Sequence, residues 1–361
     1  MHLKHYKELD GIRAIAALMV MFFHFFIDIQ SDNWLLLAIQ KISIVGQTGV
    51  SLFFVLSGFL ISRILLNTKN DDSYFVNFYV RRSLRIFPLY FFFLVLFYFI
   101  LPPLENKAIP PFSQQVYFWT YLQNLALTFN WNFAGPGHFW SLAVEEHFYL
   151  FWPFVIYFLN QHQIKRAVLI MIILACITRF VLLQNNLEVF YFTFSRMDEL
   201  SVGALLAILE REGKLIAANA YKLLISFIAV FIPTVIIWIV SSGMAIDAIQ
   251  IIKFVLLSFA FFSIIGFVIS VKENHWLKNA LKNIFLSYTG KISYGLYVYH
   301  PVCFYFIQTY FPIDSILVSM LVSFAFSYLV AGFSYRFFES RFLVLKDRFS
   351  HGKSGALQKV F

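Results

Sequence analysis

Residues 223–241 read LLISFIAVFIPTVIIWIVS, nineteen consecutive residues without one charged side chain. At a rise of about 1.5 Å per residue, a helix of this length covers a bilayer hydrocarbon core about 30 Å thick. The rest of the chain has the same character, because 60% of its 361 residues are hydrophobic and only 13% are charged. Soluble proteins carry about 25% charged residues. This composition excludes a soluble globular domain and indicates an integral membrane protein.

Nine further apolar runs bring the number of predicted spans to about ten. The ten ranges are Ile12–Ile29, Ile44–Leu66, Leu84–Leu101, Phe139–Leu159, Ala167–Gln184, Met197–Leu209, Leu223–Ser241, Gln250–Val271, Ile292–Phe311 and Ser315–Arg336. The sixth is short and has Asp198 and Glu199 at its start, which weakens it as a span. The run Leu122–Phe133 is too short to cross and is interpreted as a re-entrant or interfacial segment. We therefore expect an all-α fold, a polytopic integral membrane helical bundle of about ten transmembrane helices.

Basic residues are distributed unequally between the two sides of this predicted bundle. If the N-terminus is cytoplasmic, 23 of the 28 lysines and arginines fall in inner loops or tails. This excess predicts that both termini are cytoplasmic in a multi-pass protein of the inner (cytoplasmic) membrane. It also indicates that the +9 chain has the lipid bilayer, and not nucleic acid, as its partner. We divide the chain into a membrane unit, residues 1–340, and a basic cytoplasmic tail, residues 341–361.

Two ionisable residues of the first predicted helix share one face. Arg13 and His24 are eleven residues apart, almost three helical turns, which places His24 about 16 Å deeper in the membrane. Ionisable groups at such depth are costly and often functional. A cation at the cytoplasmic rim and a titratable imidazole near mid-membrane suit a site that draws an anionic ligand from the cytosol. An anchoring arginine with a hydrogen-bonded core histidine is an equally good interpretation of this helix alone.

The inner loop before the third predicted span contains three arginines in five residues, RRSLR at 81–85. Arg82 and Arg85 are three residues apart and would lie on one helix face. The forked guanidinium group suits phosphate better than a lysine does. Arg81 is as well explained as an anchor at the cytoplasmic surface.

The segment GPGHFWSLAVEEH, residues 135–147, breaks the chain with two glycines and a proline just before a helix. His138 and Glu145 are seven residues apart, so they would share a face about two turns apart. Glu145 and Glu146 are adjacent and point to different sides, so at most one of them faces His138. A solvated cluster at the outer interface is the alternative, and it fits Glu146 and His147 better than Glu145.

Six blocks occur in one order along the chain and together resemble the membrane acyltransferase-3 family. They are LDGIR at 9–13, His24, GVSLFFVLSGFLI at 49–61, RRSLRIFPLYF at 81–91, GHFWSLAVEEHFYLFWP at 137–153 and ISYGLYVYHPV at 292–302. The resemblance implies an O-acyltransferase that moves an acyl group, usually acetyl from acetyl-CoA, to a hydroxyl of a surface or lipid-linked carbohydrate. Acceptors in the family include O-antigen, exopolysaccharide and cell-wall glycan. Many relatives carry an extra esterase-like extracellular domain, and we expect this chain to represent the stand-alone form.

The resemblance also implies roles for individual residues. The family's Arg-x10-His pair falls on Arg13 and His24, its RxxR pair on Arg82 and Arg85, and its glutamate on Glu145. These matches make His24, Glu145 and Arg13 the catalytic candidates. Arg13, Arg82 and Arg85 would bind the donor, acetyl-CoA or another acyl-CoA. The expected acceptor-side residues are His138, Ser141 and Glu146, and we expect no metal.

Two questions stay open from the sequence. His24 could act as a general base toward the acceptor hydroxyl or could form a transient acyl-histidine. The same buried charges would also suit a proton-coupled transporter or flippase of a glycolipid or small solute. The chain has no detectable inverted repeat and no paired broken helices, which argues against that alternative.

Overall fold

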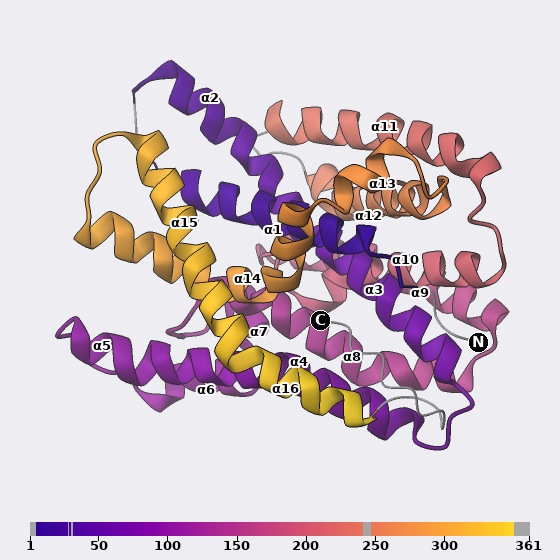
Figure 1. Cartoon of the computed structure of the whole chain (residues 1–361), viewed down its shortest axis with the longest axis horizontal. Coiled ribbons are helices and arrows are strands. Elements are labelled where there is room, and N and C mark those ends of the chain that lie inside the picture. The colour runs from indigo at the N-terminus through magenta and orange to yellow at the C-terminus, as the bar shows by residue number, and fades with distance from the viewer. Residues whose placement is uncertain (1–4, 28, 30–31, 241–246, 350–361) are drawn as a thin grey trace.

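The computed structural model describes residues 5–27, 29, 32–240 and 247–349, and all regular secondary structure within these ranges is helical. Ten long helices form the body of the molecule (Figure 1). They are α1 (Glu8–Phe26), α3 (Thr48–Thr68), α4 (Tyr74–Val95), α8 (Trp140–Phe158), α9 (Gln161–Gln184), α10 (Thr193–Arg211), α11 (Ala217–Val240), α12 (Asp247–Ser270), α14 (Ile284–Tyr310) and α15 (Ile316–Ser334). Each predicted apolar range falls on one of these helices.

Short elements connect the long helices. Helix α2 (Trp34–Ser43) enters α3 through a 3-10 turn, and α13 (Trp276–Leu281) precedes α14. A π-turn joins α4 to α5 (Leu101–Leu104), and α6 (Phe112–Trp119) and α7 (Gln123–Thr128) occupy the connection to α8. The expected interfacial segment thus contains α7. A second π-turn carries α15 into α16 (Ser340–Lys346), so helix continues across residue 340, and residues 350–361 of the predicted tail lie outside the described residues.

Seven helices of the described chain are long and apolar enough to cross a membrane, which makes this a polytopic helical membrane protein. The other three long helices are α8, α10 and α14, and their composition is too polar for this count. They carry the buried or half-buried ionisable residues Glu145 and Glu146, Arg196 with Asp198 and Glu199, and His300. Ten crossings therefore remain a prediction, and the three uncounted helices are those with polar groups inside the bundle.

Helices α3 and α10 pack closely because each offers a glycine to the other. A Cβ atom at Gly58 would lie 1.8 Å from the carbonyl oxygen of Leu200, and one at Gly203 would lie 2.1 Å from that of Val55. Small residues allow such close backbone approach between membrane helices. The contact fixes α3, which forms one wall of the candidate site, against the buried helix α10.

Helix α10 begins with a buried set of paired charges. The Arg179 Nη2 atom on α9 lies 2.7 Å from the Asp198 carboxylate, and Arg196 Nε lies 2.8 Å from Glu199. The Arg196 guanidinium also stacks 3.9 Å from the ring centre of Phe254 on α12. Buried charges persist only when they are paired in this way. The pairing explains how Asp198 and Glu199 are accommodated at the start of the predicted sixth span.

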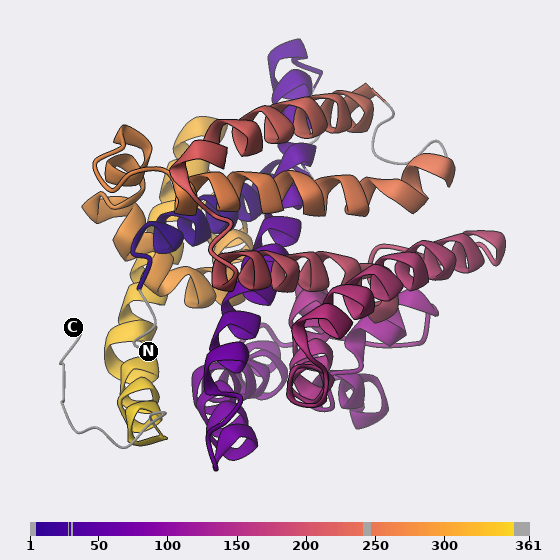
Figure 2. The same cartoon turned by 90° about the vertical axis from the view of Figure 1, so that its right-hand side faces the viewer.

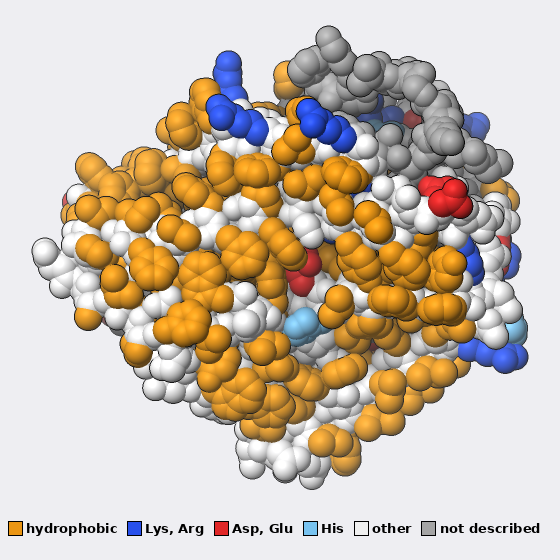
Figure 3. Space-filling view, turned by 90° about the horizontal axis from the view of Figure 1, so that it is seen from below, with side chains coloured by type: hydrophobic (Ala, Val, Ile, Leu, Met, Phe, Trp, Pro, Cys, Tyr) orange, Lys and Arg blue, Asp and Glu red, His pale blue; other side chains and the backbone are white. Residues whose placement is uncertain are grey.

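The outer surface of the bundle is apolar. Helices α11 and α12 run side by side along one edge in Figures 1 and 2, and only 11% of the most apolar α11 window is buried. Figure 3 shows a face dominated by hydrophobic side chains, with lysines and arginines toward its margins. In the middle of that face an acidic side chain and a histidine lie at the floor of a hollow. An apolar band with charges at its edges is the surface that a bilayer requires.

Candidate active site

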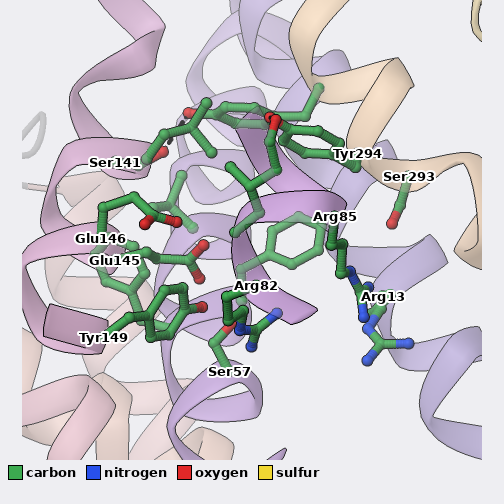
Figure 4. Close-up of a pocket in the computed structure, with 16 residues that line it drawn as sticks. Arg13, Ser57, Arg82, Arg85, Ser141, Glu145, Glu146, Tyr149, Ser293 and Tyr294 are labelled. Atoms are coloured by element: carbon green, nitrogen blue, oxygen red, sulfur yellow. Dashed lines mark hydrogen bonds between the residues drawn. The ribbon is translucent and has the colours of Figure 1, made fainter. Parts of the chain in front are cut away.

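A cavity lies between α1, α3, α4, α8 and α14 (Figure 4). Its polar lining residues are Arg13, Ser57, Arg82, Arg85, Ser141, Glu145, Glu146, Tyr149, Ser293, Tyr294 and Tyr297. Its apolar lining residues are Val50, Phe53, Phe54, Ile86 and Leu142. Figure 4 shows Arg13 and Arg85 on one side of this cavity and the two glutamates of α8 on the other. Five helices that are distant in sequence thus contribute to one polar chamber.

A second cavity continues the first toward the predicted cytoplasmic side. The two share Arg13, Ser57, Arg82 and Arg85 in their linings, and the second adds Arg81 and Lys346. Five of its ten lining residues are basic. Opposite charges attract strongly across such a low-dielectric cleft, so this entrance favours an anionic ligand.

The arginines are held by local contacts at this entrance. Arg82 and Arg85 lie one turn apart on α4, as the sequence predicts, and both face the cavity. The Arg82 guanidinium stacks 4.4 Å from the ring centre of Tyr149, and its Nε atom is buried without a hydrogen-bond partner in the described structure. Arg13 donates a 2.5 Å hydrogen bond to Asp10 one turn earlier on α1. The predicted convergence of Arg13, Arg82 and Arg85 is therefore present in the structure.

The carboxylates of α8 line the deeper part of the cavity. Glu145 lies beside Ser57 and Tyr149, with which it interacts through hydrogen bonds. Glu146 also lines the cavity, and its Oε1 atom is buried with no hydrogen-bond partner among the described residues. The alternative of a solvated outer cluster is therefore wrong for Glu146, because its Oε1 atom is buried inside the bundle. His147 instead bonds to Thr193, with 2.7 Å between Nδ1 and Oγ1.

Three histidines meet just beyond the cavity. The His24 ring centre lies 5.0 Å from that of His300 and 6.4 Å from that of His138, and the last two are 5.5 Å apart. His300 Nε2 lies 2.9 Å from His24 Nδ1. The sequence placed His24 and His138 in the site but did not predict that His300 contacts His24. The reason is that α1 packs along α14, which no local pattern indicates.

A short hydrogen-bond chain separates the histidines from the cavity. The Tyr297 hydroxyl donates to the backbone carbonyl of His138 at 2.5 Å. Ser141 Oγ lies 2.5 Å from the same hydroxyl, so Ser141 must donate to it. No histidine of the described chain lines the cavity itself, because Ser141 and Tyr297 close its inner end. His138 therefore joins the histidine cluster, whereas Glu145 faces the arginines, although seven-residue spacing suggested a shared face.

Several tyrosines of this site were missed from the sequence. Tyr149 follows Glu145 by four residues, and Tyr297 precedes His300 by three, so both spacings indicate a shared helix face. Either could have been found by extending the argument used for Arg82 and Arg85. Among the described residues, no group of three or more His, Cys, Asp or Glu side chains is arranged to hold a metal ion.

Comparison with known proteins identifies the family of the chain. The O-acetyltransferase OatA of Staphylococcus aureus, from strain NCTC 8325 / PS 47 and from strain COL, is 28% identical over 93% of this chain. The chain spans 57–58% of the length of the curated relatives it matches. No solved structure matches it. The family profile described as an acyltransferase domain (Acyl_transf_3) matches residues 6–335, and the chain belongs to this acyltransferase-3 family.

Proposed function

We propose that this protein is an O-acyltransferase of the inner membrane that transfers acetyl from cytoplasmic acetyl-CoA to a hydroxyl of a surface or lipid-linked carbohydrate. The observation that carries the proposal is a pair of adjoining cavities that share Arg13, Arg82 and Arg85, with basic residues at the entrance and two glutamates farther in. Family membership favours this enzyme over a transporter or flippase built around the same charges.

The basic entrance suits the donor. Coenzyme A is a polyanion, and Arg13, Arg82 and Arg85 offer guanidinium groups that pair with phosphate oxygens in a forked geometry. Arg81 and Lys346 line the second cavity, which forms the same entrance. With the phosphates held there, the flexible pantetheine arm would carry the thioester inward between α3, α4 and α8.

The transfer step requires a group that takes the hydroxyl proton. In our proposal His24 accepts this proton through a ring nitrogen while the acceptor oxygen forms a bond to the thioester carbonyl carbon. The carbon–sulfur bond then breaks, and the leaving thiolate recovers the proton from His24. An acyl-His24 intermediate remains the alternative route. Either route requires Ser141 and Tyr297 to move aside, since they separate the cavity from His24.

The acceptor would enter from the opposite side. We assign to the acceptor Ser141 and Glu146, which line the cavity, and His138, which lies beside His24 outside it. Glu145 would orient the reacting groups, and the buried Glu146 oxygen would accept a sugar hydroxyl. The relatives are named O-acetyltransferases, which supports acetyl as the group transferred. Candidate acceptors are O-antigen, exopolysaccharide and cell-wall glycan.

Inverted membrane vesicles test this proposal, because they expose the predicted cytoplasmic side to added acetyl-CoA with a radiolabelled acetyl group. We expect wild-type vesicles to place label in an alkali-labile ester of the carbohydrate fraction. His24→Ala should lower the rate by about 10²–10⁴-fold, which is typical for loss of a general base. Glu145→Gln should also slow the transfer, at unchanged protein level in the membrane.

The matched control is His162→Ala, which removes an exposed histidine at the start of α9 and should leave the rate unchanged. Equal labelling by wild type and His24→Ala would refute the catalytic role of His24. Vesicles that accumulate a solute but incorporate no acetyl ester would support the transporter alternative instead.

A further inference from the structure

Backbone contacts determine which nitrogen atoms of the histidine cluster donate hydrogen bonds and which accept them. His300 is fully buried, and its Nδ1 atom lies 2.9 Å from the carbonyl oxygen of Leu296, one turn earlier on α14. A carbonyl oxygen can only accept a hydrogen bond, so His300 Nδ1 carries the proton. In a neutral imidazole the other nitrogen is then an acceptor, which leaves His300 Nε2 with a lone pair.

This lone pair determines the protonation of His24. His300 Nε2 faces His24 Nδ1 at 2.9 Å, and two lone pairs would repel at that distance. His24 Nδ1 therefore donates, and the His24 ring also interacts with the carbonyl of Val20 one turn earlier on α1. In the neutral ring the Nε2 atom is then left unprotonated. Neighbouring rings with centres 5.0–6.4 Å apart would also repel if they were charged, so three neutral imidazoles are the consistent state.

The third ring is held in the same manner. His138 Nε2 lies 3.3 Å from the carbonyl oxygen of Val298 and donates to it. Pro301 has no N–H group, so the carbonyl of Tyr297, four residues earlier, lacks its usual helical partner. The His138 ring also interacts with that carbonyl. Backbone carbonyls of α14 thus hold His300 and His138 as neutral donors, and Pro301 frees one of them, that of Tyr297.

We propose that His300 is a positioning residue, which accepts the Nδ1 proton of His24 and so keeps the His24 Nε2 lone pair free for the acceptor hydroxyl. This inference rests on the proposed function and assigns the reacting atom within it. His300 is not itself the base, because it has no exposed surface and its Nε2 is occupied by His24. His24 is half-buried and so remains reachable by a substrate.

Three substitutions at one position separate the contacts of His300. The Gln amide can place its oxygen where histidine has Nε2, so His300→Gln keeps an acceptor for His24 Nδ1–H. The shorter side chain of His300→Asn reaches the Leu296 carbonyl but not His24. His300→Leu removes both contacts. Thr289→Val is the matched control, because Thr289 lies on the same helix as His300 and the substitution removes its 2.9 Å hydroxyl contact with Tyr328 of α15.

The maximal rate and the KM for acetyl-CoA are measured with radiolabelled acetyl-CoA in inverted vesicles. We expect His300→Asn and His300→Leu to lose about 10²–10⁴-fold in maximal rate with unchanged KM, as when a catalytic histidine loses its orienting partner. His300→Gln should stay within about tenfold of wild type, and Thr289→Val should equal wild type. A Gln variant as inactive as the Leu variant, or a fully active Leu variant, would overturn the assignment.

A second measurement does not depend on transfer. Nitrogen NMR of the purified protein with labelled histidine rings reports which nitrogen of His24 carries the proton. We expect a protonated Nδ1 and an unprotonated Nε2 in the wild type and in His300→Gln. Protonation at Nε2 in the wild type would overturn the proposal even if acetyl transfer occurs. Absence of transfer by wild-type vesicles would instead contradict the proposed function and leave the NMR result to decide the tautomer.

Discussion

The surroundings of Arg82 and Arg85 leave both guanidinium groups able to bind a ligand. Arg82 stacks on Tyr149 and keeps a buried, unpartnered Nε, whereas Arg85 is exposed where the two cavities join. Neither guanidinium forms an ion pair among those found in the described structure. Both therefore retain hydrogen-bonding capacity that a phosphate could use.

We expect Arg82→Ala or Arg85→Ala to weaken acetyl-CoA binding by about 1.5–3 kcal/mol, because each removes one charge-assisted contact. The lysine variants should recover only part of this loss, since the fork is absent. Calorimetry of purified protein with coenzyme A measures the effect, and Lys222→Ala, an exposed charge on α11, is the control. Normal binding by the alanine variants would mean that the pair only anchors α4 at the membrane surface.

At the scale of the element, glycine contacts decide which helices can meet. Gly203→Val should prevent α10 from reaching α3, since even a Cβ atom there lies 2.1 Å from a backbone oxygen. We expect little folded protein in detergent extracts, measured by monodisperse size-exclusion recovery. Gly266→Ala is the control because its Cβ would meet only leucine methyl groups, the nearest at 3.2 Å. Wild-type recovery of Gly203→Val would show that α3 and α10 can separate.

The ion pair between α9 and α10 gives a second prediction at this scale. Arg179→Ala would leave the Asp198 carboxylate buried without its partner, which typically costs 3–5 kcal/mol. The double variant Arg179→Met with Asp198→Leu should recover most of this loss, because both charges are then absent. Thermal unfolding in detergent measures both variants. A double variant less stable than Arg179→Ala would mean that the pair does more than neutralise charge.

The elements were largely predictable and their contacts were not. Apolar runs located every long helix because lipid imposes a length and a composition on each. Spacing within one helix also paired Arg82 with Arg85 correctly. Contacts between helices were missed, as with His300 and His24, because they depend on packing of segments 276 residues apart. The sequence included Glu146 among the acceptor-side residues, but what surrounds its carboxylate depends on the other helices that line the cavity with α8.

At the scale of the whole molecule, ion pairs gather the ends of several helices at one side. Glu8 at the start of α1 pairs with Lys278 of α13 at 3.2 Å, and Arg63 near the end of α3 pairs with Glu210 near the end of α10 at 2.6 Å. The two basic residues, Lys278 and Arg63, are among the 23 that the predicted topology places on the cytoplasmic side. The excess of basic residues predicts that this side, with the arginine entrance of the site, faces the cytosol.

The last prediction tests that orientation. In a chain with Cys176 and Cys303 replaced by alanine, Asn106→Cys and Lys353→Cys are labelled with a membrane-impermeant maleimide. We expect Asn106→Cys, in the predicted outer connection after α5, to react in intact cells. Lys353→Cys should react only after the membrane is opened, because the basic residues then lie inside. Labelling of Lys353→Cys in intact cells would reverse the orientation, place Arg13, Arg82 and Arg85 outside, and exclude a cytoplasmic acyl-CoA as the donor.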